Sequence, residues 1–203
     1  MRTVSRSAVP ALTAGQMRAV DRAVVEDLHI ELVQMMENAG RNLAAARHLA
    51  NRGAQVQVVL SEPDRLAPVP ARQADILARM GVIVACQPAA ADLVIDALIG
   101  YSLRGDPAGT AAELITWAST QAAPVLALDT PSGLDVTTGV AGAPAIRAAA
   151  TLTLALPKAG LLDAPGVGEL YLADISVPPL VYQRMGIRVP ALFGQSSLLR
   201  IVP

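Results

Sequence analysis

Aromatic residues are scarce in this chain of 203 residues, where they make up 2% of the total. Because 53% of the residues are hydrophobic and the mean hydropathy is +0.44, Ala, Val and Leu must build the core instead. Such side chains suit helices packed on a parallel sheet. At this length we expect residues 1–203 to form a single domain with a substantial buried core.

Cysteine is nearly absent, and the single Cys86 excludes an internal disulfide. It gives no hint of an oxidising compartment, and we expect it to be a small buried residue of a strand over 82–86. No apolar run approaches the roughly 18 residues needed to cross a bilayer. Residues 1–10 contain arginines but no apolar signal segment. These absences favour a cytoplasmic protein without a membrane partner.

A large excess of either charge is also absent, since the formal net charge is −1. This removes the usual electrostatic case for a nucleic-acid or anionic membrane partner, so the ligand should be small. The chain also lacks Gly-Xaa-Ser-Xaa-Gly, His-Glu-Xaa-Xaa-His, Cys-Xaa-Xaa-Cys and Walker motifs. Serine hydrolase, zinc protease and nucleoside triphosphatase chemistry therefore have no support.

Helical and extended patterns alternate along the chain. For example, apolar residues at Met17, Val20, Val24 and Leu28 recur every three or four positions, as in a helix with one buried face. The alternation predicts an α/β protein: a Rossmann-like three-layer sandwich with a mostly parallel sheet, helices on both faces and right-handed crossovers. The predicted helices cover most of 14–53, 71–80 and 107–120, and 63–71 is expected to be a loop. The predicted strands cover 55–60, 82–86, 93–96, 125–129, 151–157 and 169–175, which we expect to be the last.

Two aspartates follow apolar runs, Asp96 after Leu-Val-Ile and Asp129 after Val-Leu-Ala-Leu. Runs that are apolar on both faces suit buried parallel strands, and ligands of such sheets bind outside the carboxyl ends of the strands. The spacing accommodates one strand-helix-strand unit, so we expect neighbouring strands and a shared crevice. Two nearby carboxylates repel unless a cation or proton intervenes, and oxygen ligands favour a hard cation. Alternatively, each aspartate only caps the turn that follows it.

The loops after these strands add further candidates. Gly100 and Gly105 allow backbone amides to face a phosphate with which Arg104 could pair, although Arg104 could equally be a solvated surface charge. Ser132 lies in a Pro-Ser-Gly phrase that is also good turn chemistry. Lys158 is the only lysine, and its compact charge suits a phosphate or a carboxylate, unless its presence is compositional chance.

Five phrases, in this order, resemble the NAD(P)H-hydrate epimerase family, also called the YjeF N-terminal domain. They are Leu-Thr-Ala-Gly-Gln-Met (12–17), Met-Glu-Asn-Ala-Gly-Arg (36–41), Asp-Ala-Leu-Ile-Gly-Tyr-Ser-Leu-Arg-Gly-Asp (96–106), Asp-Thr-Pro-Ser-Gly-Leu-Asp (129–135) and Leu-Pro-Lys-Ala-Gly-Leu (156–161). The resemblance runs from about residue 12 to about residue 185.

The resemblance implies an isomerase that interconverts the R and S forms of hydrated NADH and NADPH, which are then substrates and not redox cofactors. It implies a potassium ion held by Asp96 and Ser132, and Asp129 as both substrate-binding residue and catalytic acid-base. It also implies a homodimer, for which the methionine-rich helix near Met35 offers a contact, and coupling to an ATP- or ADP-dependent dehydratase. The implied substrate-binding residues are Gly100, Tyr101, Ser102, Leu103, Arg104, Gly105, Asp106, Asp129 and, from its Pro-Lys phrase, Lys158.

The chain departs from the family near 43–45, where a strand and its Gly-Asn-Asn-Gly-Gly-Asp-Gly loop are missing. The gap, on the order of thirty residues, removes amides that would face phosphate and one asparagine ligand of potassium. It should also leave unpaired strand edges. Three explanations are open: an incomplete or spliced chain, a deletion that abolished activity, or a site rebuilt in another way. The alternative functions are a non-catalytic nucleotide-binding or scaffold domain, and a different nucleotide-sugar or sugar-phosphate enzyme.

Overall fold

The computed structural model of this chain describes residues 1–28, 41–194 and 196–203. The chain divides into two compact units, one made of Met1–His29 with Asp92–Pro203 and the other of Ile30–Ala91. The phrase Met-Glu-Asn-Ala-Gly and the proposed contact at Met35 lie outside the described residues. The single-domain organisation and the missing strand stay predictions.

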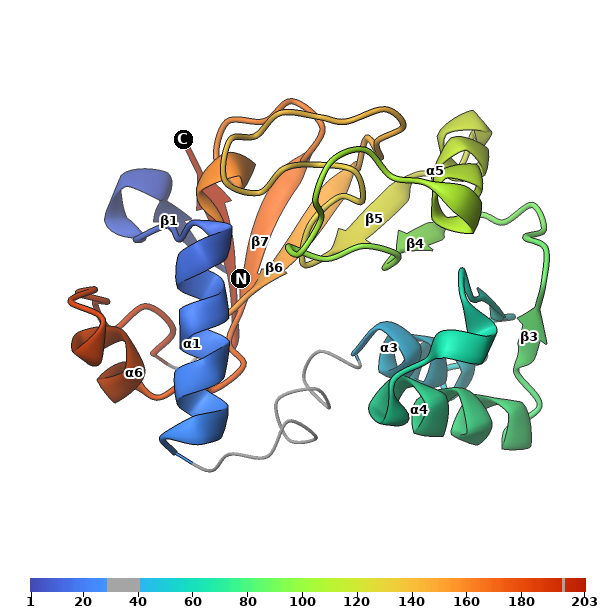
Figure 1. The fold of residues 1–203 in the computed structure, drawn as a ribbon, viewed down its shortest axis with the longest axis horizontal. Helices are drawn as coiled ribbons and strands as arrows, with labels where there is room; N and C mark the ends of the chain where they lie inside the picture. The colour runs from blue at the N-terminus through green and yellow to red at the C-terminus, as the bar shows by residue number, and fades with distance from the viewer. Residues whose placement is uncertain (29–40, 195) are drawn as a thin grey trace. The chain divides into compact units, whose positions relative to one another are not determined.

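The first unit is built on a six-stranded sheet with the order β1-β8-β7-β6-β5-β4 (Figure 1). Its strands are β1 (Arg2–Ser5), β4 (Val94–Asp96), β5 (Val125–Leu128), β6 (Ala150–Leu154), β7 (Glu169–Ala173) and β8 (Leu198–Val202). All neighbours are parallel except β7 and β8, which are antiparallel. The predicted α/β class with a mostly parallel sheet is therefore confirmed.

Helix α5 (Gly109–Thr120) covers part of this sheet with its apolar side chains. Ile115 and Ala118 are buried against Val125 and Ala127 of β5, together with residues that follow this strand. Val125 and Ala127 are two positions apart and so point to the same face of the sheet. Burial of a side chain such as Ile115 contributes about 1.5–3 kcal/mol, which fixes the strands whose carboxyl ends carry the candidate site.

Helix α1 (Ala14–Glu26) begins at a capping box, because the Thr13 side chain accepts from the amide of Gln16 while the Gln16 side chain accepts from the amide of Thr13. Just before it, Leu12 forms a parallel bridge with Lys158. The Leu12 amide donates to the Pro157 carbonyl at 2.9 Å, and the Leu12 carbonyl accepts from Ala159 at 2.8 Å. The start of α1 is thus attached to the segment that follows β6.

Shorter helices complete the first unit: η1 (Arg6–Ala8), η3 (Ala159–Leu161) and α6 (Pro179–Arg184). No helix in the described ranges has both the length and the apolar character to span a membrane.

The described part of the second unit contains helices and a pair of parallel strands. Its elements are α3 (Arg41–Ala50), β2 (Gln57–Val59), η2 (Pro63–Arg65), α4 (Pro68–Arg79) and β3 (Ile83–Ala85). Leu77 of α4 is fully buried, whereas Ile83 of β3 is 63% exposed. Among the described residues β2 pairs only with β3, and β4 of the first unit pairs only with β5. A two-stranded sheet is marginal by itself.

Several sequence-based expectations were wrong. The strand at β7 is not the last, because β8 follows it and lies between β7 and β1. The expected loop over 63–71 contains η2 and the start of α4, since Pro68 occupies the first turn of a helix, where proline needs no amide partner. Cys86 lies just after β3 and is exposed, not buried.

Candidate active site

The candidate site lies where β4 and β5 end. The two strands are parallel neighbours, with Asp96 opposite Ala127 in the register, so the expected adjacency of the Asp96 and Asp129 strands is confirmed. The loops that follow them, 97–108 and 129–149, therefore leave the sheet at the same edge.

Asp96 and Ser132 form one buried cluster at this edge, with relative exposures of 3% and 0%. The Ser132 amide donates to Oδ2 of Asp96 at 2.7 Å, and the Ser132 hydroxyl donates to Oδ1 at 2.6 Å. The same hydroxyl accepts from the Ile99 amide at 2.9 Å. Burial raises the pKa of Asp96, and the hydrogen bonds from Ser132 and Leu98 oppose that rise. Asp96 thus ties two loops together, as a turn-capping aspartate does, and it also offers a buried negative charge.

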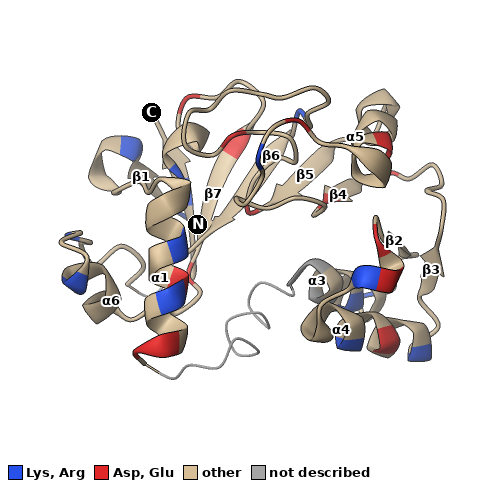
Figure 2. Ribbon diagram, viewed as in Figure 1, with Lys and Arg blue, Asp and Glu red and all other residues tan. Residues whose placement is uncertain are grey.

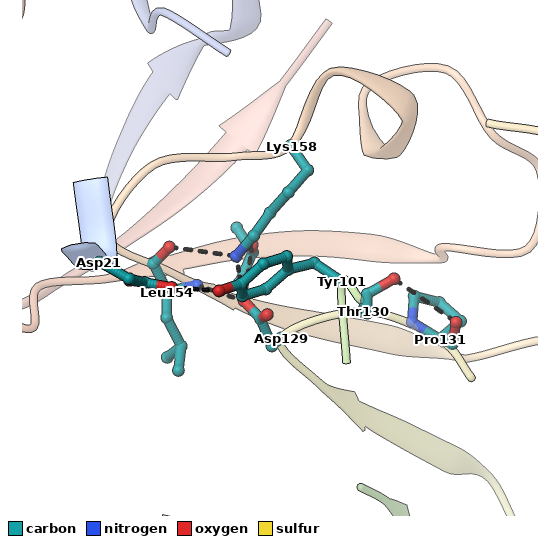
Figure 3. Close-up of polar contacts among 8 residues, drawn as sticks. Asp21, Tyr101, Asp129, Thr130, Pro131, Leu154 and Lys158 are labelled. Carbon is teal, nitrogen blue, oxygen red and sulfur yellow. Dashed lines mark hydrogen bonds and ion pairs between the residues drawn. The ribbon is translucent and has the colours of Figure 1, made fainter. Parts of the chain in front are cut away.

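Asp129 and Lys158 form a second cluster (Figure 3). The Lys158 side chain is 1% exposed, and its ammonium donates to Oδ1 of Asp129, to the Thr153 hydroxyl at 3.2 Å and to the Leu154 carbonyl at 3.3 Å. These contacts use all three donors of the ammonium. Asp129 itself adopts φ 68°, a left-handed conformation that aspartate tolerates better than most residues. The only lysine of the chain is therefore committed to the carboxylate that ends β5.

Tyr101 brings a further carboxylate to this cluster. Its hydroxyl donates to Asp21 of α1, and the Lys158 nitrogen lies 5.9 Å from the centre of its ring. Figure 3 shows the Lys158 ammonium, the Tyr101 hydroxyl and the carboxylates of Asp21 and Asp129 converging on one place. Burial and the Asp21 carboxylate raise the pKa of Tyr101.

The rest of the loop after β4 is more open. Gly100, Ser102, Arg104 and Gly105 are exposed and Leu103 is partly buried. Asp106 is exposed too, and it accepts from the Ala143 amide at 2.9 Å.

A pocket of about 330 Å³ lies between the two loops. It is lined by Leu103, Gly105 and Asp106 on one side and by residues between Gly133 and Gly142 on the other. Gly133 has φ 92°, and a Cβ there would come within 2.5 Å of the Pro144 carbonyl. Only glycine fits this backbone, so the loop after β5 depends on it. Among the residues that line the pocket, Asp129 and Lys158 do not occur.

The two aspartates have different partners in the structure. No hydrogen bond or ion pair within the described ranges joins Asp96 to Asp129, and each has its own partners. Lys158 balances the charge of Asp129, whereas Asp96 is held by the hydroxyl and amide of Ser132. The candidate site therefore contains two adjoining clusters, one around each aspartate, and a crevice shared by the two carboxylates stays a prediction.

Two members of the second cluster, Asp21 and Thr153, were not among the predicted site residues. Asp21 lies between Arg18 and Arg22, and acidic and basic residues alternate along α1 (Figure 2). Its charge alone therefore does not distinguish it from the other charged residues of this helix. A signal was present, because position 21 follows Met17 by four residues and so adjoins the buried stripe of this helix. A carboxylate beside an apolar stripe indicates that it has a polar partner in the fold.

The fold and these loops define the class as a mostly parallel α/β protein with polar side chains gathered at the carboxyl edge of its sheet. The family model described as YjeF-related protein N-terminus matches residues 26–160. The chain belongs to this family.

Similar proteins carry names that specify an activity. An "NAD(P)H-hydrate epimerase" of Dehalogenimonas lykanthroporepellens is 38% identical over 221 residues, covering 92% of this chain and 90% of that protein. A protein of the same name from Truepera radiovictrix is 34% identical, covering 74% of this chain and 70% of that protein. A "Bifunctional NAD(P)H-hydrate repair enzyme" of Salinibacter ruber is 32% identical over 86% of this chain, which spans only 42% of that longer protein.

A solved structure agrees with the fold. The yeast protein ynu0 superposes with a TM-score of 0.78 and covers 95% of this chain and all of its own, at 15% sequence identity. At that identity the likeness concerns the fold alone.

Proposed function

We propose that this chain is an isomerase that interconverts the R and S forms of hydrated NADH and NADPH. The names of the relatives support this activity. The observation that carries it is the placement of Asp129 at the end of β5, held on one side by the buried Lys158. The non-catalytic and sugar-nucleotide alternatives gain no support from these relatives.

Asp129 is the proposed catalytic residue. Its Oδ1 atom accepts from Lys158 and from the Leu154 amide, whereas Oδ2 takes no hydrogen bond from any described residue. Because the ammonium occupies Oδ1, Oδ2 is the oxygen left for proton exchange with the substrate. A proton that Oδ2 takes up from solvent leaves with the hydroxyl as water, the carboxylate then stabilises the cationic ring, and the proton released when water adds to the other face of the ring returns to solvent. No net proton is consumed.

The loop after β4 is the proposed binding segment for the dinucleotide. Gly100, Ser102, Arg104 and Gly105 are exposed at the edge of the sheet where Asp129 lies. Arg104 is the charged partner for phosphate, while Tyr101 and Lys158 stand nearer the reacting ring. Leu103, Gly105 and Asp106 line the pocket and would contact the remainder of the molecule. The missing Asn-Asn-Gly-Gly segment leaves phosphate binding to this loop.

Asp96 and Ser132 are the proposed protein ligands for potassium. The carboxylate is buried, and none of the ion pairs of the described residues includes it. Its hard oxygens and the Ser132 hydroxyl suit an alkali cation, so the residues present fit this ion. A bound potassium ion supplies positive charge that offsets the buried carboxylate. The protein's own part is to hold both loops against β4 through Ser132.

We also propose a homodimer in the cytoplasm whose activity is coupled to that of an ATP- or ADP-dependent dehydratase. The bifunctional relatives support the pairing of activities, and a single cysteine suits a reducing compartment.

The experiment follows purified R-hydrate in the presence of potassium and a dehydratase specific for the S form. NADH should then appear at a rate set by this protein. Replacing Asp129 by Asn should slow the reaction by about 10²–10⁴-fold. Asp163→Asn is a matched control, since Asp163 forms an ion pair with Arg6 that is largely exposed, and it should change nothing. Persistence of the R form with the wild-type protein would refute the function.

A further inference from the structure

We propose that Asp21 is a positioning residue of this site and acts through the Tyr101 hydroxyl. The inference rests on the proposed epimerase function and deepens it. Asp21 lies on α1, outside the matched residues 26–160. It contributes to the reaction by holding a side chain that touches the reacting groups, and it does not contact substrate itself.

A series of contacts leads from Asp21 to Asp129 (Figure 3). The Tyr101 hydroxyl donates to Asp21, the Tyr101 ring lies over the Lys158 ammonium, and this ammonium donates to Asp129. An ammonium near an aromatic face is attracted to it. The position of the Tyr101 ring therefore influences the position of the Lys158 ammonium. The hydrogen bond to Asp21 holds the ring through its hydroxyl.

The helix that carries Asp21 is attached to the site at its start. Leu12 exchanges backbone hydrogen bonds with the residues on either side of Lys158, at 2.9 and 2.8 Å. The Ala14 amide, in the first turn of α1, donates to the Thr137 hydroxyl at 3.1 Å. Because these hydrogen bonds hold the beginning of α1 beside Lys158, the helix places Asp21 where it accepts from the Tyr101 hydroxyl. The loop that carries Tyr101 is held at Ile99 by the Ser132 hydroxyl, and the Asp21 contact adds a second attachment at Tyr101.

The location of Asp21 is costly unless the carboxylate has a purpose. It is partly buried beside the stripe of Met17, Val20 and Val24, where an apolar residue would pack without this penalty. Burial raises the pKa of Asp21, while the Tyr101 hydroxyl and the Lys158 charge oppose the rise and Asp129 adds to it.

Other charged and titratable groups surround this contact. The charge of Arg18 of α1 opposes the rise in the pKa of Tyr101, while burial and the charges of Asp174 and Asp21 raise the pKa of Tyr182 of α6. The variants below therefore change the Tyr101 partner and leave these groups in place.

A kinetic cycle tests the route through Tyr101. Asp21→Ala and Tyr101→Phe should each lower kcat by up to about 100-fold, with a smaller change in KM, because a misplaced group costs most in the transition state. The double variant should be no slower than the slower single variant. Asp21→Asn keeps an acceptor for the hydroxyl and should retain activity within about fivefold. A kcat for Asp21→Ala within twofold of wild type, or losses that multiply in the double variant, would overturn the proposal.

A matched control and a second readout separate this inference from the proposed function. Glu169→Gln alters the carboxylate that accepts from the exposed Tyr171 hydroxyl, and kcat should not change. In protein labelled with 3-fluorotyrosine, Asp21→Asn should move the Tyr101 fluorine signal and shift its titration to lower pH. Glu169→Gln should affect only Tyr171.

The outcomes are distinguishable. An unchanged Tyr101 signal in Asp21→Asn overturns the contact, whatever the activity. An inactive wild type with a normal Tyr101 response overturns the epimerase function, and with it the catalytic consequence of Asp21. An active wild type with a fully active Asp21→Ala overturns the positioning role alone.

Discussion

Replacing Lys158 by Met should destabilise the first unit strongly. Methionine keeps most of the length of the side chain, which is 1% exposed, but removes the ammonium that donates to Asp129, Thr153 and Leu154. The carboxylate then remains without its counter-charge at a position where its side chain is 18% exposed. The substitution therefore leaves an incompletely solvated charge in the protein.

The size of the effect follows from the burial of the two partners. Breaking a buried ion pair by removing one partner costs 3–5 kcal/mol. Since Asp129 keeps partial access to water, we expect the lower end, about 3 kcal/mol. Each kcal/mol moves the Tm of a chain of this size by about 2–4 °C, so the Tm should fall by about 6–12 °C.

Urea unfolding followed by tryptophan fluorescence measures this loss, because the single Trp117 lies on α5 of the same unit. Asp129→Asn is the matching change at the other partner, since asparagine tolerates the φ of 68° at this position and alanine does not. The double variant should lose about 2 kcal/mol less than the two single losses together. Losses that add to within about 0.5 kcal/mol would show that the pair does not interact, and would refute the reasoning.

Three further predictions concern other parts of the first unit. Potassium at about 100 times its Kd should stabilise the wild type by about 2.7 kcal/mol relative to tetramethylammonium at equal ionic strength, and Ser132→Ala should abolish the difference; an undiminished rise in Tm would remove Ser132 from the ion site. Gly133→Ala should cost about 3 kcal/mol or more, because strain at φ 92° combines with overlap at 2.5 Å. Gly186→Ala, with φ 71° and open space around it, should cost only about 1–2 kcal/mol, and equal losses in urea unfolding would contradict the overlap. Since burial raises the pKa of Asp21 above 3.8, the wild type loses stability as the pH rises through that pKa. Asp21→Asn, which cannot ionise, should therefore gain stability relative to wild type between acid and neutral pH, and a constant difference would argue against the buried carboxylate.

The sequence predicted the strands that carry their own signal and missed those that depend on distant partners. β4 and β5 coincide with apolar runs and β6 with an alternating one, and the predicted bounds of these strands agree with the structure to within a few residues. β1 is mostly exposed and polar, and it pairs with β8 at the opposite end of the chain. Its stability comes from that pairing, which no local pattern reveals.

The candidate site was predictable to a similar extent. Placement at strand ends predicted Asp96, Asp129 and Lys158 as candidates, because neighbouring parallel strands end at one edge. The same placement could not predict that Lys158 pairs with Asp129 and not with Asp96. The contact of Tyr101 with Asp21 joins residues that are 80 positions apart, and only the tertiary fold brings α1 beside this edge.

The most direct test of the account is a time course of the R and S hydrates themselves, separated by chromatography without any dehydratase. Wild-type protein with potassium should bring pure R-hydrate to the equilibrium mixture, and Asp129→Asn should resemble buffer alone. An R-hydrate that wild-type protein leaves unconverted, or an Asp129→Asn variant as fast as wild type, would contradict the central claim.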